Sequence, residues 1–334
     1  MPCVLVTNPI DPAGIALLET GAEVRRCPDA APDTIRRMAV EADALVIRSR
    51  LPEDIFEAAP RVRAVTVHGT GTDLIPLASA SEHGVMVANV PDGNAQSVAE
   101  HCLLGMMLLA RNFRAIDAAI RSGPWDAARA LAEPMVELGG KTLGLVGVGH
   151  IGSRLAKICA GGLGMRVLGN QRNLDRLPAG VAPAALEELL AQADFVVLTC
   201  PLTPQTHHLM NAARLAAMKR SAFLVNVGRG PVIDEDALVE ALREGRIAGA
   251  MLDVYEHYRL EPGHPLFSLP NAVLTPHLAG SARESRANVA RIAAQETLRM
   301  LDGLPPRNFV NAATIQTIRT TGNTGNNGNT QRRH

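Results

Sequence analysis

The stretch that decides the fold lies near the middle of the chain and reads Lys141-Thr142-Leu143-Gly144-Leu145-Val146-Gly147-Val148-Gly149-His150-Ile151-Gly152. Its first half is an apolar run with the length of a buried strand. Its second half is a G-x-G-x-x-G loop, and the residues from Ile151 to Ala160 follow a helical pattern. A strand, a glycine loop and a helix in this order are the context in which this motif binds a dinucleotide.

Each part of the loop has an expected task. Gly147 permits the tight turn, Gly149 lets the backbone approach a pyrophosphate, and Gly152 lets the helix pack closely on the strand. The helix that begins near His150 and Ile151 presents free N–H groups to the anion. We therefore predict that these five residues bind a dinucleotide in a Rossmann domain.

The strand that follows, 165–169, lacks the terminal carboxylate that would bond the 2′-hydroxyl of NAD. It runs instead into Asn170-Gln171-Arg172-Asn173. A guanidinium suits a 2′-phosphate because the two form charge-assisted hydrogen bonds. We predict that Gln171 and Arg172 contact the cofactor and that NADP(H) is preferred, with NAD(H) as the second possibility. A solvated surface arginine is the plain alternative.

Strand and helix patterns alternate on both sides of this loop, which predicts parallel sheets with crossover helices. Apolar β-branched runs predict strands at 4–6, 44–47, 62–67, 85–89, 142–146, 166–168, 195–199, 222–226, 249–253 and 272–275.

A long helix is expected from Ser97 to Arg111, because Ser97 and Glu100 have the spacing of a capping box. Residues 103–109 are apolar almost all round. A helix of this kind is typically buried between layers or between subunits.

The composition excludes several classes of protein. Among 334 residues, Lys+Arg and Asp+Glu both count 33, so the basic excess of a nucleic-acid-binding protein is missing. The hydrophobic content of 47% excludes a largely disordered chain. The apolar runs are too short to span a bilayer, so no membrane partner is expected.

The five cysteines show no C-x-x-C spacing, which argues against a zinc site or a disulfide framework. We therefore predict no metal. Reduced thiols, together with a first segment that lacks a basic signal-peptide region, predict a cytoplasmic protein.

Three further segments follow predicted strands, where ligands of α/β folds bind. They read Asn226-Val227-Gly228-Arg229-Gly230, Leu252-Asp253-Val254-Tyr255 and Thr275-Pro276-His277-Leu278-Ala279-Gly280. Additional ordered motifs are Val98-Ala99-Glu100-His101, Gly139-Gly140-Lys141-Thr142-Leu143-Gly144 and Pro201-Leu202-Thr203. With these motifs, the chain resembles the D-isomer-specific 2-hydroxyacid dehydrogenase family over about residues 4–311.

The resemblance implies two catalytic side chains whose chemistry suits the reduction of a 2-keto acid. Arg229 would hold the substrate carboxylate and polarise the carbonyl, because a guanidinium is always charged and forks onto oxygens. His277 would transfer the proton, because an imidazole donates and accepts protons near neutral pH. The ordinary alternatives are a surface ion pair and a histidine bonded to backbone.

The resemblance also implies contacts with the cofactor and the substrate. Asp253 would orient the nicotinamide carboxamide, and the backbone N–H groups of Thr70 and Gly71 would hold the substrate carboxylate. Arg48 and Ser49 would line the substrate mouth. The remaining cofactor contacts implied are Pro201, Thr206, Val227 and Gly280.

One position departs from the family pattern. The family has a Glu-Pro pair five residues after the aspartate, and its glutamate bonds the catalytic histidine. Here Tyr258 stands five residues after Asp253, and Glu261-Pro262 stands eight after it. We predict that Glu261 supports the histidine, with Glu256 and Tyr258 as alternatives.

The resemblance implies an α/β protein of two doubly wound parallel-sheet domains with the keto acid between them. Residues 1–96 and 286–311 would form the substrate-binding domain, and residues 97–285 an inserted dinucleotide-binding Rossmann domain. Residues 312–334 are rich in Gly, Asn and Thr and are expected to be a disordered tail. The apolar helix and the segment around Trp125 resemble the family's dimerisation region, so a homodimer is expected.

The expected activity is hydride transfer between NADP(H) and a small 2-keto or D-2-hydroxy acid of the glyoxylate/hydroxypyruvate type. An NAD-dependent D-3-phosphoglycerate dehydrogenase is the alternative enzyme, in which Arg48 and Arg50 would bind the phosphate. Because of the displaced glutamate, a cofactor-sensing binding protein similar to a corepressor is the alternative of another class.

Overall fold

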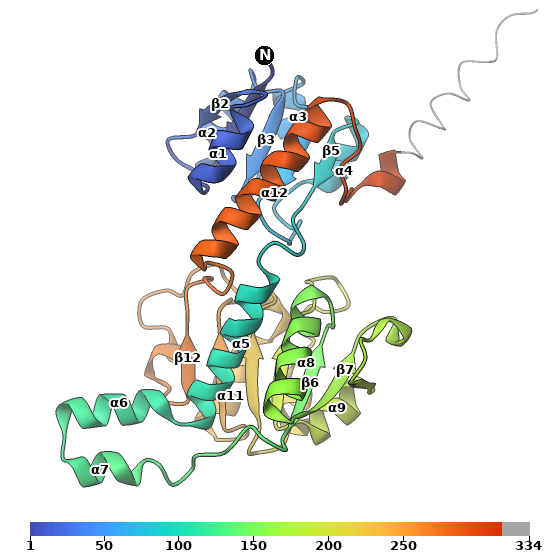
Figure 1. Cartoon of the computed structure of the whole chain (residues 1–334). Helices are drawn as coiled ribbons and strands as arrows, with labels where there is room; N and C mark the ends of the chain where they lie inside the picture. The colour runs from blue at the N-terminus through green and yellow to red at the C-terminus, as the bar shows by residue number, and fades with distance from the viewer. Residues whose placement is uncertain (316–334) are drawn as a thin grey trace, which may run out of the picture. The chain divides into compact units, whose positions relative to one another are not determined.

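The computed structural model describes residues 1–315, and the chain folds into two compact units (Figure 1). Among the described residues, 1–94 and 282–315 form the first unit, and 95–281 form the second. Each unit has one sheet in which every named strand pairs in parallel with its neighbours. The prediction of two doubly wound parallel-sheet α/β domains is confirmed.

The first unit has a five-stranded sheet in the order β2-β1-β3-β4-β5. Its strands are β1 (Cys3–Val6), β2 (Glu23–Arg26), β3 (Ala44–Ile47), β4 (Ala64–Val67) and β5 (Met86–Ala88). Its helices are α1 (Pro12–Leu18), α2 (Pro32–Ala39), α3 (Ile55–Ala58), α4 (Leu77–Glu82) and α12 (Arg283–Leu301). The edge strand β2 escaped prediction because its sequence, Glu-Val-Arg-Arg, is polar and only half-buried.

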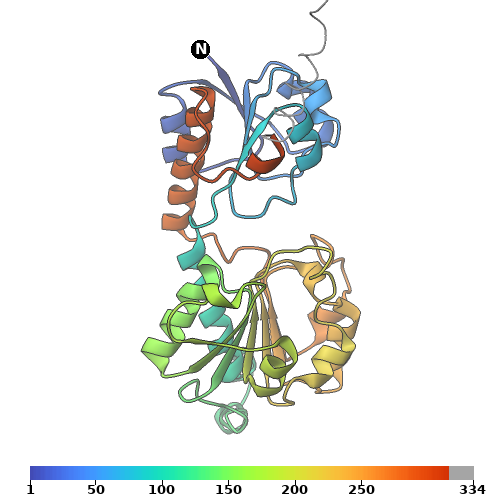
Figure 2. The same cartoon turned by 90° about the vertical axis from the view of Figure 1, so that its right-hand side faces the viewer.

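Two helices from opposite ends of the chain, α1 and α12, pack side by side in this unit (Figures 1 and 2). The contact needs Gly14, because a Cβ at this position would lie 2.8 Å from the carbonyl oxygen of Ala290. A buried hydrogen bond of 2.8 Å between the hydroxyls of Thr66 and Thr297 joins α12 to β4. The last long helix is thus a structural part of the first unit.

The second unit has a seven-stranded sheet in the order β12-β11-β10-β9-β6-β7-β8. Its strands are β6 (Thr142–Val146), β7 (Arg166–Asn170), β8 (Val181–Pro183), β9 (Phe195–Leu198), β10 (Phe223–Asn226), β11 (Gly249–Leu252) and β12 (Ala272–Leu274). Its helices are α5 (Ala95–Ala110), α6 (Phe113–Ser122), α7 (Trp125–Ala130), α8 (His150–Leu163), α9 (Leu186–Gln192), α10 (Ala212–Ala217) and α11 (Glu235–Arg243). Helices cover both faces of this sheet (Figure 2), and each face has its own apolar core.

The predicted capping box at the start of α5 is wrong. The helix begins at Ala95, so Ser97 lies inside its first turn. The Ser97 hydroxyl donates to the carbonyl oxygen of Ala279 at 2.8 Å, and Glu100 accepts from the Gln96 side chain at 2.9 Å. The Ser97 hydroxyl therefore bonds a residue distant in sequence instead of capping the N-terminus of α5.

The predicted disordered tail begins too early. Residues 312–315 form a helical turn, and the side chain of Ile315 is only 3% exposed. Burial of this apolar side chain explains why the fold extends past residue 311. The rest of the predicted tail, 316–334, lies outside the described residues.

Within residues 1–315, no helix combines the length and the apolar character needed to cross a membrane.

The α1–α12 contact gives a test of the fold. We expect Gly14→Ala to lower the free energy of unfolding by about 1–3 kcal/mol, because the added methyl group overpacks the main chain of α12. Urea unfolding, with hydrogen exchange of the α1 and α12 peptides, measures the change. The control is Gly161→Ala in α8, where a Cβ meets no atom within 4 Å. The free energy of unfolding of Gly161→Ala should be about 0.5–1 kcal/mol higher than that of the wild type, because alanine is more favourable than glycine inside a helix. A Gly14→Ala protein as stable as the wild type would contradict the packing.

Candidate active site

The glycine loop between β6 and α8 is shaped by close backbone contacts. Gly147 has φ +88°, and a Cβ there would lie 2.7 Å from the backbone nitrogen of Cys200. A Cβ on Gly152 would lie 2.7 Å from the carbonyl oxygen of Gly147, so α8 starts in direct contact with the loop. Both positions require glycine.

Gly149 differs, because a Cβ there would meet no atom within 4 Å. It immediately precedes α8, whose first residues are His150 and Ile151. By helix geometry, the first N–H groups of this 14-residue helix take no part in its own backbone hydrogen bonds. This open position at a helix N-terminus fits the diphosphate of a dinucleotide.

The segment after β7 fits the ribose end of such a cofactor. Asn170 closes the strand and donates to the carbonyl oxygen of Ala184 at 2.9 Å. The Gln171 side chain donates to the carbonyl oxygen of Asn173 at 2.8 Å. Arg172 is exposed. The segment thus presents an exposed guanidinium where an NAD-specific site has a carboxylate.

The other sequence-predicted residues of this unit also follow parallel strands. Pro201 and Thr206 follow β9, Val227 and Arg229 follow β10, and Asp253 follows β11. The segment 275–280, with His277 and Gly280, follows β12. Because these strands are neighbours in one parallel sheet, the segments share its carboxyl edge with the glycine loop.

Arg229 is held by its own loop. Its Nη1 donates to the carbonyl oxygen of Gly228 at 2.8 Å, and its carbonyl oxygen accepts from the side chain of Asn226 at 3.0 Å. Asn226 is fully buried and also accepts from the N–H of Gly228. The buried amide thereby fixes the turn that carries the half-buried guanidinium.

The buried carboxylate of Asp253 organises the segment that carries His277. It accepts hydrogen bonds from the Thr275 hydroxyl (2.6 Å) and from the N–H groups of Leu278 and Ala279 (both 2.9 Å). The carbonyl oxygen of Asp253 accepts from the His277 N–H at 2.9 Å. These contacts make Asp253 a strand-end cap, whatever its role toward a cofactor.

His277 itself has a left-handed backbone, φ +54°, and an exposed side chain. Few non-glycine residues adopt this conformation, although histidine is among the more tolerant types. The ring of Tyr258 meets the His277 ring edge-on, with 6.3 Å between their centroids. The structure thus presents the imidazole at the surface of this unit.

His101 in α5 is a residue that sequence analysis placed in a motif without a role. Its Nε2 lies 3.1 Å from the Thr275 hydroxyl and 3.8 Å from the Asp253 carboxylate. Burial lowers the pKa of His101, and the charge of Asp253 opposes this shift. Its position next to a buried carboxylate is visible only in the tertiary structure.

The three candidates for support of His277 have different surroundings. Glu256 lies 3.1 and 3.2 Å from Nε2 of His208 through its two oxygens. Glu261 has an exposed side chain, and Tyr258 is 79% exposed. Glu256 is therefore already engaged with another histidine.

The first unit carries the four predicted substrate residues at the ends of two adjacent strands. Arg48 and Ser49 follow β3, and Thr70 and Gly71 follow β4. The Ser49 hydroxyl donates to Asn8 Oδ1 at 2.8 Å, and Arg48 Nη1 donates to the carbonyl oxygen of Pro9 at 3.2 Å. The Thr70 hydroxyl donates to the carbonyl oxygen of Val90 at 3.3 Å.

His68 stands two residues before Thr70 and was not singled out by sequence analysis. Within the described residues its buried Nε2 has no hydrogen-bond partner. Burial, with the nearby charge of Arg48, lowers the pKa of His68 to about 4. The imidazole is therefore neutral at physiological pH.

Comparison with known proteins identifies relatives along the chain. Residues 103–279 match the family model described as "D-isomer specific 2-hydroxyacid dehydrogenase, NAD binding domain". A glyoxylate reductase of Aeropyrum pernix is 38% identical over 94% of this chain and 97% of its own length. A D-3-phosphoglycerate dehydrogenase of Methanocaldococcus jannaschii is 36% identical over 93% of this chain and 60% of its own length.

A solved structure also resembles the chain. It is an NADPH-dependent glyoxylate/hydroxypyruvate reductase of Sinorhizobium meliloti in complex with NADP and malonate. It has a TM-score of 0.83 and 28% identity, over 94% of this chain and 97% of that one.

The half-buried His68, whose Nε2 is buried, makes stability depend on pH. Its pKa is about 4 in the folded chain against an ordinary value of 6.5, so the unfolded chain binds a proton first as pH falls. We expect this residue to lower the free energy of unfolding by about 2 kcal/mol between pH 7 and pH 5. Urea unfolding at the two pH values measures the loss. His68→Gln should reduce it, and His83→Gln, at an exposed position, should not. Equal pH dependence in wild type and His68→Gln would contradict this account.

Proposed function

The chain belongs to the D-isomer specific 2-hydroxyacid dehydrogenase family, whose members are oxidoreductases acting on CH–OH groups, and we propose that it reduces a small 2-keto acid such as glyoxylate or hydroxypyruvate with NADP(H). The reverse direction oxidises the D-2-hydroxy acid. The observation that carries the proposal is the shared sheet edge, where the glycine loop, Arg229 and His277 all follow parallel strands. Two relatives, 38% and 28% identical to this chain, are named as a glyoxylate reductase and a glyoxylate/hydroxypyruvate reductase, which supports the proposed substrate class.

The residues of the second unit divide the work of the proposed reaction. Arg229 binds substrate oxygens and stabilises negative charge that develops on the carbonyl oxygen. His277 delivers the proton to that oxygen and takes it back in the reverse direction. Asp253 keeps the His277 segment in place through its buried hydrogen bonds. The bound nicotinamide cofactor supplies or accepts the hydride.

The remaining predicted residues bind the two ligands. We propose that Gly147, Gly149, Gly152, His150 and Ile151 hold the diphosphate. Further cofactor contacts are proposed for Gln171, Arg172, Pro201, Thr206, Val227, Asp253 and Gly280. Proposed substrate contacts are Arg48, Ser49, Thr70 and Gly71.

The preference for NADP(H) over NAD(H) follows from charge. Arg172 is exposed after β7, and the strand ends in Asn170 instead of a carboxylate. A guanidinium attracts a 2′-phosphate, and a carboxylate would repel it. The Sinorhizobium meliloti relative is itself named as NADPH-dependent.

A homodimer in the cytoplasm is part of the proposal. Helices α5 to α7 expose five large apolar side chains: Leu104 (49%), Met107 (40%), Phe113 (53%), Ile120 (40%) and Trp125 (68%). Apolar side chains gathered on consecutive helices are typical of a subunit interface. The helices α6 and α7 form an arm at one end of the second unit (Figure 1), which suits exchange of this surface between two copies.

The proposed activity predicts turnover with a specific cofactor. We expect glyoxylate or hydroxypyruvate to give faster cofactor oxidation than pyruvate or 3-phosphohydroxypyruvate, and NADPH to give a higher kcat/KM than NADH. Arg172→Ala should lower kcat/KM with NADPH by about tenfold, because one charge-assisted contact is lost. The same change should leave kcat/KM with NADH nearly unchanged. Absorbance of the reduced cofactor measures both.

The controls separate the alternatives. Arg176→Ala removes an exposed arginine a few residues further on and should leave the cofactor ratio unchanged. Preference for 3-phosphohydroxypyruvate would favour the phosphoglycerate dehydrogenase, in which the exposed Arg48 and Arg50 would bind the substrate phosphate. Tight cofactor binding without turnover of any keto acid would favour the cofactor-sensing protein. NADH equal to or better than NADPH would end the cofactor proposal.

We also propose that Glu261 is the acid that keeps His277 protonated for reduction. Glu261→Gln is expected to lower the apparent pKa of the pH–rate profile and to decrease kcat, because the stabilising carboxylate is lost. Glu256→Gln is the matched control, since that carboxylate is paired with His208. An unchanged profile in Glu261→Gln with a collapse in Glu256→Gln or Tyr258→Phe would transfer the role.

A further inference from the structure

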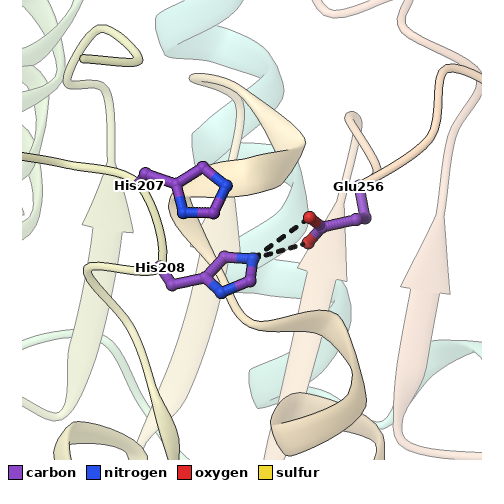
Figure 3. Close-up of side chains that lie close together, drawn as sticks. All are labelled: His207, His208 and Glu256. Carbon is purple, nitrogen blue, oxygen red and sulfur yellow. Dashed lines mark hydrogen bonds and ion pairs between the residues drawn. The ribbon is translucent and has the colours of Figure 1, made fainter. Parts of the chain in front are cut away.

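Three side chains outside the proposed catalytic groups form a second cluster in the same unit. His207 and His208 lie in the loop between β9 and α10, and Glu256 lies in the loop after β11. Figure 3 shows a ring nitrogen of His208 facing both carboxylate oxygens of Glu256, with the His207 ring beside that of His208. One ligand atom from each of the three residues lies within 4.8 Å of the others.

The distances in this cluster are close to those that a metal ion needs. Two ligand atoms bound to one tetrahedral Zn²⁺ at about 2.1 Å lie about 3.4 Å apart. Nε2 of His208 lies 3.1 Å from Oε1 of Glu256. The His207 and His208 rings are stacked with 4.0 Å between centroids, and His207 is exposed, so its ring can reorient toward an ion at low cost.

The backbone beneath the ligands is anchored. His208 has φ +48°, and its N–H donates to the carbonyl oxygen of Pro231 at 2.8 Å. The N–H of Glu256 donates to Oε2 of Glu235 at 3.1 Å, and Oε1 of Glu235 lies 3.2 Å from Nε2 of His264. Anchors of this kind hold metal ligands in position.

The ligand set favours one class of ion. Two imidazoles and one carboxylate suit a borderline divalent transition metal, whereas Mg²⁺ and Ca²⁺ prefer oxygen ligands only. We propose that His207, His208 and Glu256 form a binding site for a divalent transition-metal ion of the Zn²⁺ class. The exposed side of His207 leaves room for water to complete the coordination.

An ion at this site would brace the segment that carries Arg229. A Cβ on Gly230 would lie 1.6 Å from the carbonyl oxygen of Tyr255, so the Tyr255–Glu256 backbone packs directly against the residue after Arg229. The ion links this backbone to the loop of His208. The site is therefore structural or regulatory, and no reaction step passes through it.

The test measures metal binding by the full-length protein without substrate or cofactor. Chelator-treated wild type is titrated with ZnCl₂ at pH 7.5 by calorimetry, and in parallel with CoCl₂ by visible absorption. We expect Zn²⁺ binding with a raised Tm, and a cobalt spectrum without the thiolate-to-cobalt charge-transfer band. His208→Gln and Glu256→Gln should each weaken binding at this site at least about tenfold, because one ligand is lost.

The matched control is His257→Gln, which removes an exposed histidine next to Glu256 that is outside the cluster. It should bind like wild type. The His208→Gln/Glu256→Gln double variant, checked for folding by circular dichroism, should lose one equivalent of metal. The proposal is overturned if wild type binds no Zn²⁺, if the folded double variant binds as much as wild type, or if the cobalt spectrum shows thiolate ligation. The first outcome would leave His208 and Glu256 as an ordinary hydrogen-bonded pair, independently of any dehydrogenase activity.

Discussion

Parallel strand pairing is the constraint on which the rest of the second unit depends. A chain that pairs its strands in parallel must cross over between them, so every strand leaves the sheet at the same edge. In the seven-stranded sheet this edge collects the glycine loop, Arg229 after β10, Asp253 after β11 and His277 after β12. Residues far apart in sequence meet because of topology, and the helices that make the crossovers supply the two apolar cores.

Buried polar side chains give this edge its detailed shape. Asn226 and Asp253 have almost no exposed surface. Asn226 binds the backbone of the turn after its own strand, β10, and Asp253, which follows β11, binds the backbone of the segment after the neighbouring strand β12. A left-handed residue other than glycine costs about 1–3 kcal/mol. Hydrogen bonds to a charged group contribute about 1.5–3 kcal/mol each. The hydrogen bonds that Asp253 accepts thus offset the strain at His277 and hold the segment 275–280 in one conformation.

The pair of His208 and Glu256 changes how the displaced glutamate is understood. Sequence spacing left three candidates for support of His277, and nothing in the spacing separated them. The structure engages Glu256 with His208 and leaves Glu261 exposed on the same loop. The same pair, joined by His207, is the centre of the proposed metal site, so one contact bears on both questions.

The sequence by itself determined the α/β class, the positions of most strands and the glycine loop, because these depend on local periodicity and on backbone space that only glycine allows. The local pattern was wrong where a residue distant in sequence supplied the partner. Ser97 bonds Ala279 instead of capping its helix, and the polar strand β2 pairs at the edge of the sheet. Only the tertiary structure decided that His101 meets Asp253 and that His208 meets Glu256. These contacts join separate strands and loops across the fold, and spacing along the chain carries no information about such distances.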